Sequence, residues 1–209
     1  MYRNMDASTL ISCASTAGLS AGTHYCQGTA IGDFDNDGFE DVLITGYGGV
    51  QLLHNQGDGT FADTTSTAMV DDRLWSTSAA WGDLNGDGNL DLYVVHYVDW
   101  SFENDPNCPT VDRQRRERCP PQRFEPLPDV IYLSTGDGAF VESSKECGLR
   151  RDGKGLGVVL ADLDSDGDLD IYVANDTVEN FLYRNDGHPT FEEIAVAAGC
   201  AFNETGAPD

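Results

Sequence analysis

The sequence predicts an all-β protein made of β-propeller blades, each a four-stranded antiparallel sheet, in a partial open propeller of about three and a half blades. Three observations predict this fold. An acidic motif occurs three times, a hairpin motif is woven between its copies, and corresponding positions lie about 50 residues apart. Self-similarity at a fixed period is the signature of a repeat architecture, and four short strands in about 50 residues is the size of one blade.

The acidic motif has the form DxDxDGxxD, with Asn allowed at the third position. Its copies begin at Asp33, Asp83 and Asp162 and read DFDNDGFED, DLNGDGNLD and DLDSDGDLD. Carboxylates crowded this closely repel one another, so such a loop is stable only when it is fully solvated or when it encloses a cation. Three copies with the same spacing and the same Gly favour the cation over a solvated acidic turn.

Each copy of the motif is flanked by runs that are typical of strands. A small and apolar run precedes it (GTAIGDF, TSAAWGDL, GVVLADL), and a run rich in β-branched and aromatic residues comes after it (DVLITG, DLYVVHY, DLDIYVAND). A third run leads into a GDG or DG turn and a fourth run that begins at Phe61, Phe140 or Phe191, which is a strong hairpin signal. We therefore expect the aromatic residues of these runs to lie in the blade cores.

The repeat divides the chain into four parts. Residues 1–27 hold the last strands of a preceding blade and a linker, residues 28–77 form the first blade, residues 78–156 form the second, and residues 157–209 form the third with a linker to a further blade. The second blade carries a cysteine-containing insertion at about residues 97–128. Because three blades cannot close a ring, we expect open faces on the end blades, with marginal stability or self-association.

Composition limits the partners and the compartment. The 209-residue chain has a net charge of −24, which disfavours nucleic acid and anionic membranes as partners and favours cations. No run of about 18 apolar residues occurs, so membrane insertion is not expected. The opening MYRNMDASTL has no signal pattern, so any export signal would lie outside this sequence. Six cysteines without a CxxC pair favour an exported protein, extracellular or periplasmic.

Calcium is the cation that suits the acidic loops best. Ca²⁺ takes six to eight oxygen ligands in a flexible cage, whereas Mg²⁺ demands stricter geometry and keeps its waters. An EF-hand would need a Glu at the twelfth loop position and flanking helices, but that position is Ile44, Val94 or Val173, each within an expected strand. The ninth position is Asp in every copy and would close the cage early.

The three loops resemble the calcium loops of FG-GAP (VCBS-type) repeats, which form the blades of integrin-α-like β-propellers. The linking phrases LYRNDG, NQGDGTFAD and AGL are similar to the branch that contains cartilage acidic protein and the ASPIC/UnbV proteins. The insertion, YVDWSFENDPNCPT and then RCPPQRFEPLPDVIY, also resembles a cysteine-containing excursion of that branch. The resemblance implies a long exported protein with about seven blades.

The resemblance also implies three calcium sites. In each loop the side chains at positions 1, 3, 5 and 9 and the backbone carbonyl at position 7 would ligate the ion, and the second site, with one carboxylate fewer, would bind more weakly. The carboxylate of Asp168 would face water. The implied ligands are Asp33, Asp35, Asp37, Phe39 and Asp41; Asp83, Asn85, Asp87, Asn89 and Asp91; and Asp162, Asp164, Asp166, Asp168 and Asp170.

Cys108 and Cys119 bracket ten residues of the insertion. A disulfide is favoured over a zinc site there, because the insertion contains no His. Between the two cysteines lie four arginines, which could form a docking patch for an anionic glycan or protein. We favour the alternative, that they pair with the acidic propeller surface or simply keep the loop soluble. The four are Arg113, Arg115, Arg116 and Arg118. The other four cysteines allow further pairing that the sequence does not specify.

The function that these features favour is a calcium-binding scaffold for protein or glycan binding or adhesion. The alternatives are a non-catalytic portion of a larger secreted enzyme, for glycan processing or natural-product tailoring, and a purely structural spacer. No catalytic motif occurs. The least poor acid–base candidate is His96 with Asp99, and a strand-end His on a blade edge is the stronger interpretation.

Overall fold

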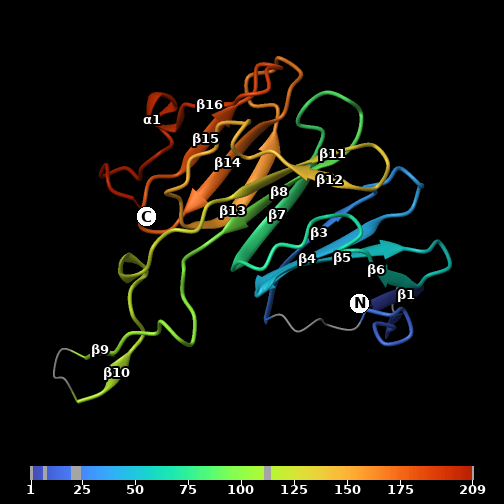
Figure 1. Ribbon diagram of the computed structural model, residues 1–209, viewed down its shortest axis with the longest axis horizontal. Coiled ribbons are helices and arrows are strands. Elements are labelled where there is room, and N and C mark those ends of the chain that lie inside the picture. The colour runs from blue at the N-terminus through green and yellow to red at the C-terminus, as the bar shows by residue number, and fades with distance from the viewer. Residues whose placement is uncertain (1, 7–8, 20–24, 111–113, 209) are drawn as a thin grey trace.

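The computed structural model describes residues 2–6, 9–19, 25–110 and 114–208. It contains three four-stranded antiparallel sheets that lie side by side as the blades of an open, partial β-propeller (Figure 1). Among the described residues, no helix is long and apolar enough to cross a membrane. The one α-helix of the described chain is the short α1 (Ala195–Ala198).

The first blade consists of β3 (Tyr25–Gly32), β4 (Asp41–Tyr47), β5 (Gly49–Asn55) and β6 (Phe61–Asp63). The second consists of β7 (Ser76–Gly82), β8 (Asp91–His96), β11 (Val130–Ser134) and β12 (Phe140–Glu142). The third consists of β13 (Gly155–Ala161), β14 (Asp170–Asn175), β15 (Phe181–Arg184) and β16 (Glu192–Glu193). Strands are arranged in chain order within each sheet, and the acidic loops join the first strand to the second.

In the described parts of the chain, two small hairpins lie outside the blades. The first pairs β1 (Tyr2–Asp6) with β2 (Thr9–Ser12). The second pairs β9 (Cys108–Pro109) with β10 (Arg116–Glu117), and the 3₁₀ turn η1 (Pro121–Arg123) comes directly after it. This second hairpin belongs to the excursion between β8 and β11, which projects from the second blade (Figure 1).

The core lies between the blades. Alternation along β8 explains how one strand serves two interfaces: Leu92 and Val94 join the cluster shared with the first blade, and Tyr93 and Val95 join the cluster shared with the third. All six residues of β8 are buried. The strand is therefore apolar at successive positions because its blade packs against a neighbouring blade on each face.

The same backbone hydrogen bond fastens the outer strand of every blade. The N–H of Phe61 donates to the carbonyl of Ala17, that of Phe140 to Ala68, and that of Phe191 to Cys147, at 2.8, 3.0 and 3.0 Å. Each acceptor lies in the tight turn that comes before the blade. The turns that contain Ala17, Ala68 and Cys147 thus hold the outer strands of the blades that follow them.

The third blade presents an apolar face on its far side. Leu156 and Val159 of β13 are 51% and 59% exposed, whereas Val158 and Leu160 of the same strand pack against the core shared with the second blade. This open face agrees with the partial ring expected from three blades.

Candidate metal sites

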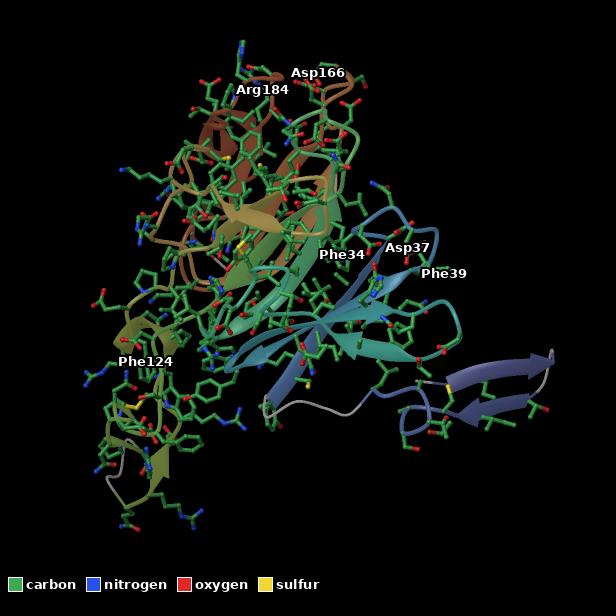
Figure 2. The ribbon with its side chains drawn as sticks, turned by 45° about the vertical axis from the view of Figure 1, so that its right-hand side comes forward. Phe34, Asp37, Phe39, Phe124, Asp166 and Arg184 are labelled. Carbon is green, nitrogen blue, oxygen red and sulfur yellow. A yellow bond between two sulfur atoms is a disulfide. The ribbon has the colours of Figure 1, made fainter. Side chains whose placement is uncertain are left out.

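The acidic loops all lie at one end of the blades, and the excursion lies at the other (Figure 2). Asp37 and Asp166 mark two of the loops, and Phe124 marks the base of the excursion. Strands flank every loop on both sides, as expected for a propeller and unlike an EF-hand.

The first aspartate of each loop accepts hydrogen bonds from backbone N–H groups farther along the same loop. Oδ2 of Asp33 accepts from Gly38 at 2.8 Å, and the corresponding bonds, from Gly88 to Asp83 and from Gly167 to Asp162, measure 2.9 and 3.2 Å. These glycines have φ values of 90°, 86° and 104°, in the left-handed region that L side chains avoid. The turn that the three loops share therefore requires Gly at its sixth position.

The last aspartate of each loop, Asp41, Asp91 or Asp170, is buried and clamps the loop to the third strand. One carboxylate oxygen of Asp91 accepts from Leu84 N at 2.9 Å, and the other accepts from Ser134 N at 2.8 Å. Asp41 bonds in the same way to the backbone of Phe34 and Asn55, and Asp170 to that of Leu163 and Asn185.

Burial disfavours the charged form of two of these clamp residues, Asp41 and Asp91, when no cation is near. It raises the pKa of Asp91 to about 6, against the lowering effect of its two backbone hydrogen bonds, and it also raises the pKa of Asp41. A bound cation would favour the charged form instead, because it supplies the missing opposite charge.

In two of the three loops the structure brings three of the five predicted ligands together. Oxygen atoms of Asp33, Asp35 and Asp41 lie within 4.8 Å of one another, and so do those of Asp162, Asp164 and Asp170. The second loop forms no such acidic group within the described chain, since Asn85 replaces a carboxylate. The fifth-position aspartates Asp37, Asp87 and Asp166 each accept from the backbone N–H of the seventh residue, respectively Phe39, Asn89 and Asp168, at 2.8–2.9 Å.

An unpartnered oxygen shows that the first loop fits a cation. Oδ1 of Asp35 is buried and has no hydrogen-bond partner. A buried carboxylate oxygen without a donor is costly, and a cation satisfies it directly. The donor set is all oxygen, which suits Ca²⁺.

Sequence reasoning missed two side chains beside the loops. Nε2 of His54, on β5, lies 3.0 Å from Oδ2 of Asp35 and 3.2 Å from Oδ2 of Asp37. In the third blade, Asp186 lies within 4.8 Å of Asp164 and Asp166. The acidic motif could not reveal His54 or Asp186, because both follow it on the chain and come close to the loop only through strand pairing.

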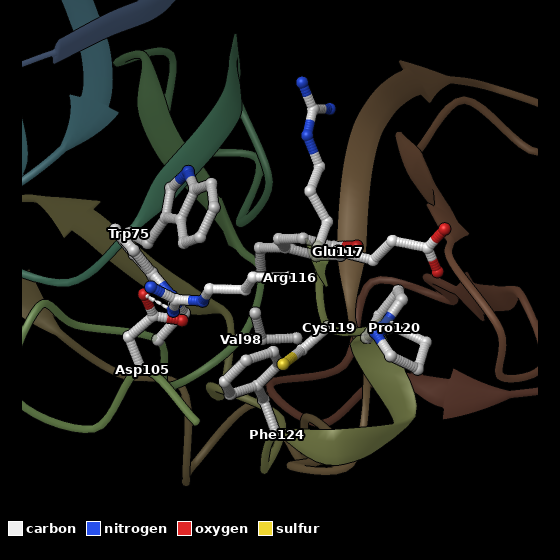
Figure 3. Close-up of a pocket in the computed structure, with 12 residues that line it drawn as sticks. Trp75, Val98, Asp105, Arg116, Glu117, Cys119, Pro120 and Phe124 are labelled. Atoms are coloured by element: carbon white, nitrogen blue, oxygen red, sulfur yellow. Dashed lines mark hydrogen bonds and ion pairs between the residues drawn. The ribbon is translucent and has the colours of Figure 1, made fainter. Parts of the chain in front are cut away.

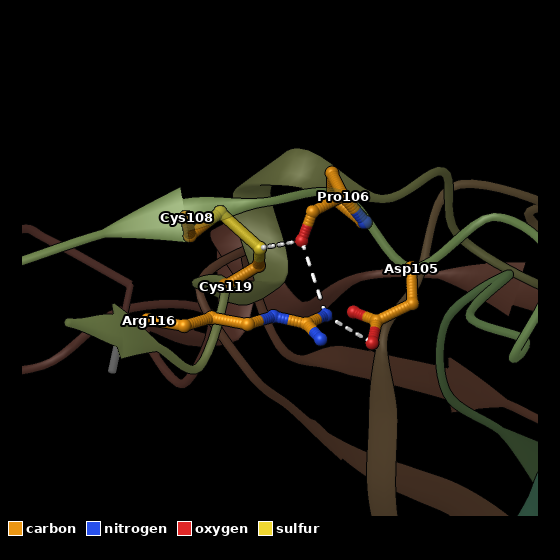
Figure 4. The surroundings of a disulfide bond; sticks show 5 residues. All are labelled: Asp105, Pro106, Cys108, Arg116 and Cys119. Carbon is orange, nitrogen blue, oxygen red and sulfur yellow. Dashed lines mark hydrogen bonds and ion pairs between the residues drawn. A yellow bond between two sulfur atoms is a disulfide. The ribbon is translucent and has the colours of Figure 1, made fainter.

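The disulfide between Cys108 and Cys119 is confirmed. The two Cα atoms are 5.3 Å apart, and the bond closes the excursion hairpin (Figure 4). Arg116 forms an ion pair with Asp105 of the same excursion rather than with the acidic surface of the propeller, and Arg113 lies outside the described residues. The thiols of Cys147 and Cys200 do not form a disulfide.

The weak acid–base candidate is wrong. His96 is fully buried, and its Nε2 pairs with Oδ2 of Asp72 at 2.5 Å rather than with Asp99. Its Nδ1 lies 2.6 Å from the carbonyl oxygen of Pro128. The pair joins the end of β8 to the segment that leads into β7, a contact that local sequence does not show.

The fold and its loops define a β-propeller repeat protein with an acidic turn in each blade. The model of the FG-GAP-like repeat family matches residues 33–94 and 127–173, more than half of the chain, and the interruption coincides with the excursion. This chain belongs to the FG-GAP-like repeat family.

Curated relatives point to the same branch. Cartilage acidic protein 1 of Mus musculus and of Homo sapiens are each 26% identical to this chain over 190 residues, which is 83% of the chain. The aligned region is 27% of the mouse protein and 26% of the human one, so the chain spans about a quarter of these relatives. A solved structure of an Agrocybe aegerita lectin, described as recognising non-reducing terminal N-acetylglucosamine, covers 91% of the chain at 18% identity, with a TM-score of 0.44.

Proposed function

We propose that this chain is a calcium-binding propeller segment of an exported protein and serves as a rigid scaffold for protein or glycan binding or adhesion. The observation that carries the calcium proposal is the buried, unpartnered Oδ1 of Asp35 in a loop whose other carboxylates converge beside it. The disulfide of the excursion supports an oxidising compartment outside the cytoplasm.

Calcium acts here as a structural ion. Each site uses positions 1, 3, 5 and 9 of its loop and the carbonyl of position 7, so a bound ion fixes the turn between the first two strands of a blade. Because the ion binds the folded loop and not the unfolded chain, the free energy of unfolding should rise with calcium concentration.

Isothermal titration calorimetry on the full chain tests this proposal. We expect three calcium ions per chain, and chelation should lower the melting temperature by several degrees. Asp35→Asn should weaken the first site, whereas Asp58→Asn, in an exposed turn of the same blade, should leave the titration unchanged. A featureless calcium titration together with an unchanged melt in EDTA would refute the proposal.

A further inference from the structure

A cavity of about 820 Å³ lies where the excursion meets the second blade (Figure 3). Its size is within the range of small-molecule sites. Aromatic side chains from two separate segments line it: Trp75 comes from the segment before β7, and Tyr97, Trp100 and Phe124 come from the excursion. The cavity is far from the acidic loops, which lie at the opposite end of the blades (Figure 2).

Hydrogen bonds hold the polar edges of two of these rings. Nε1 of Trp75 donates to Oε1 of Gln27 at 2.7 Å, and the Tyr97 hydroxyl donates to Asp176. The ring centroid of Trp75 lies 5.3 Å from that of Tyr97 and 5.8 Å from that of Trp100. Because the polar edges of Trp75 and Tyr97 already have partners and Trp100 packs against Trp75, the orientation of these rings is fixed, and apolar ring surface lines the cavity.

The charged lining of the cavity is balanced. Asp105 and Glu117 are matched by Arg116 and Arg118, so these four side chains sum to zero in a chain whose net charge is −24. The Asp105–Arg116 ion pair is partly exposed, with side-chain exposures of 27% and 55%. A strongly ionic ligand would find no net complement here, whereas a neutral ligand finds carboxylate acceptors and guanidinium donors close together.

We propose that this cavity binds a pyranose ring of a neutral carbohydrate. A sugar hydroxyl donates one hydrogen bond and accepts others, which matches a paired carboxylate and guanidinium. The C–H groups on the face of the ring carry slight positive charge and pack on the negative face of an aromatic ring. A proline-rich peptide could also pack on the aromatic rings, but its prolines offer no N–H donor to the carboxylates. This inference deepens the proposed scaffold function by naming its ligand class.

The disulfide gives the site its rigidity. Cys119 lines the cavity, and its bond to Cys108 closes the segment that carries Arg116 (Figure 4). A loop that is fixed before binding loses less conformational entropy when a ligand arrives.

The test measures binding of defined sugars to the full chain in saturating calcium. The probes are the methyl β-glycosides of glucose, galactose and N-acetylglucosamine, and lactose, with a proline-rich decapeptide as the competing class. Saturation-transfer NMR and tryptophan fluorescence report binding, because two of the three tryptophans line the cavity and Trp81 lies in the core. We expect at least one sugar to bind saturably in the millimolar range, and the decapeptide not to bind.

Variants locate the site. Trp75→Ala and Trp100→Ala should each weaken sugar binding about tenfold or more, and Tyr25→Ala, an exposed aromatic outside the cavity, should leave it unchanged. Calcium titration of each variant shows that the propeller is intact and separates the two proposals, since calcium binding without sugar binding overturns only the carbohydrate site. Sugar binding that survives both tryptophan variants, or saturable binding of the decapeptide alone, also overturns it.

Discussion

Replacing His96 by Leu removes a buried ion pair and should be among the most costly single changes in the second blade. The side chains of His96 and Asp72 are 0% and 4% exposed, and their atoms meet at 2.5 Å. Both ring nitrogens of His96 face acceptors, the Asp72 carboxylate and the Pro128 carbonyl, so the ring must carry two protons and a positive charge. The variant leaves the Asp72 carboxylate buried without its cation.

The expected loss is about 3–5 kcal/mol of unfolding free energy, which is typical when one partner of a buried pair is removed. Arg73→Ala is the matched control, because Arg73 pairs with Asp71 at the surface, with exposures of 77% and 49%. Such a pair contributes about 0–1 kcal/mol. The double variant His96→Leu/Asp72→Leu should recover only part of the loss. An apolar pair of similar volume is often tolerated, but Asp72 also accepts from the backbone N–H of Leu74 at 2.9 Å, and that donor loses its partner.

Urea unfolding in saturating calcium, monitored by tryptophan fluorescence, measures these differences. A single variant His96→Leu that loses less than about 1 kcal/mol, as Arg73→Ala is expected to, would refute the assignment of a buried charged pair.

The same pair predicts a pH dependence. Burial alone would lower the pKa of His96, but the hydrogen bond and charge of Asp72 outweigh it and raise the pKa above the ordinary 6.5. Burial alone would raise the pKa of Asp72, but His96 lowers it below 3.8. The contribution of His96 to the free energy of unfolding is therefore complete below pH 6.5 and is lost as the pH rises through its folded pKa. The contribution of Asp72 is lost as the pH falls below 3.8. Urea unfolding at a series of pH values should show that the free energy of unfolding declines at alkaline pH in the wild type, and declines less in the double variant. Equal declines in the two proteins would contradict a charged His96–Asp72 pair.

Three further changes have distinct expected outcomes. Tyr93→Phe removes the buried hydroxyl that donates to Asp129 at 2.9 Å and should cost about 1–3 kcal/mol of unfolding free energy in urea, and no loss would show that this bond is unimportant. Gly49→Ala places a methyl group 1.8 Å from the backbone oxygen of Asp72, at a φ of +117°, and should abolish soluble expression. Gly59→Ala, at a φ of +89° with open space around it, should lower the free energy of unfolding by only about 1 kcal/mol. Similar effects of the two variants would exclude the clash at Gly49. Asn85→Asp adds a carboxylate to the second loop and should tighten the second of the three proposed calcium sites in calorimetry. An unchanged affinity would count against the position assigned to residue 85 in the proposed cage.

The repeat and the features that depend on it could be predicted from the chain alone. The period of about 50 residues, the strand runs and the three acidic loops are local patterns, and each is read from residues adjacent in the chain. The all-β fold and the Cys108–Cys119 disulfide were predicted in this way and are confirmed. The alternation along β8 also lies in the sequence, since a strand with two neighbours must be apolar on both faces.

Contacts between distant residues became apparent only in the folded molecule. His54 reaches Asp35 because β5 pairs with β4, and His96 reaches Asp72 because β8 pairs with β7, whose first residue, Ser76, lies opposite His96 and follows Asp72 by four residues. The aromatic cavity likewise joins Trp75, which precedes β7, to an excursion that begins only after β8. Neither motif nor period encodes such contacts, because each depends on how the sheets pack and on where an irregular loop folds back.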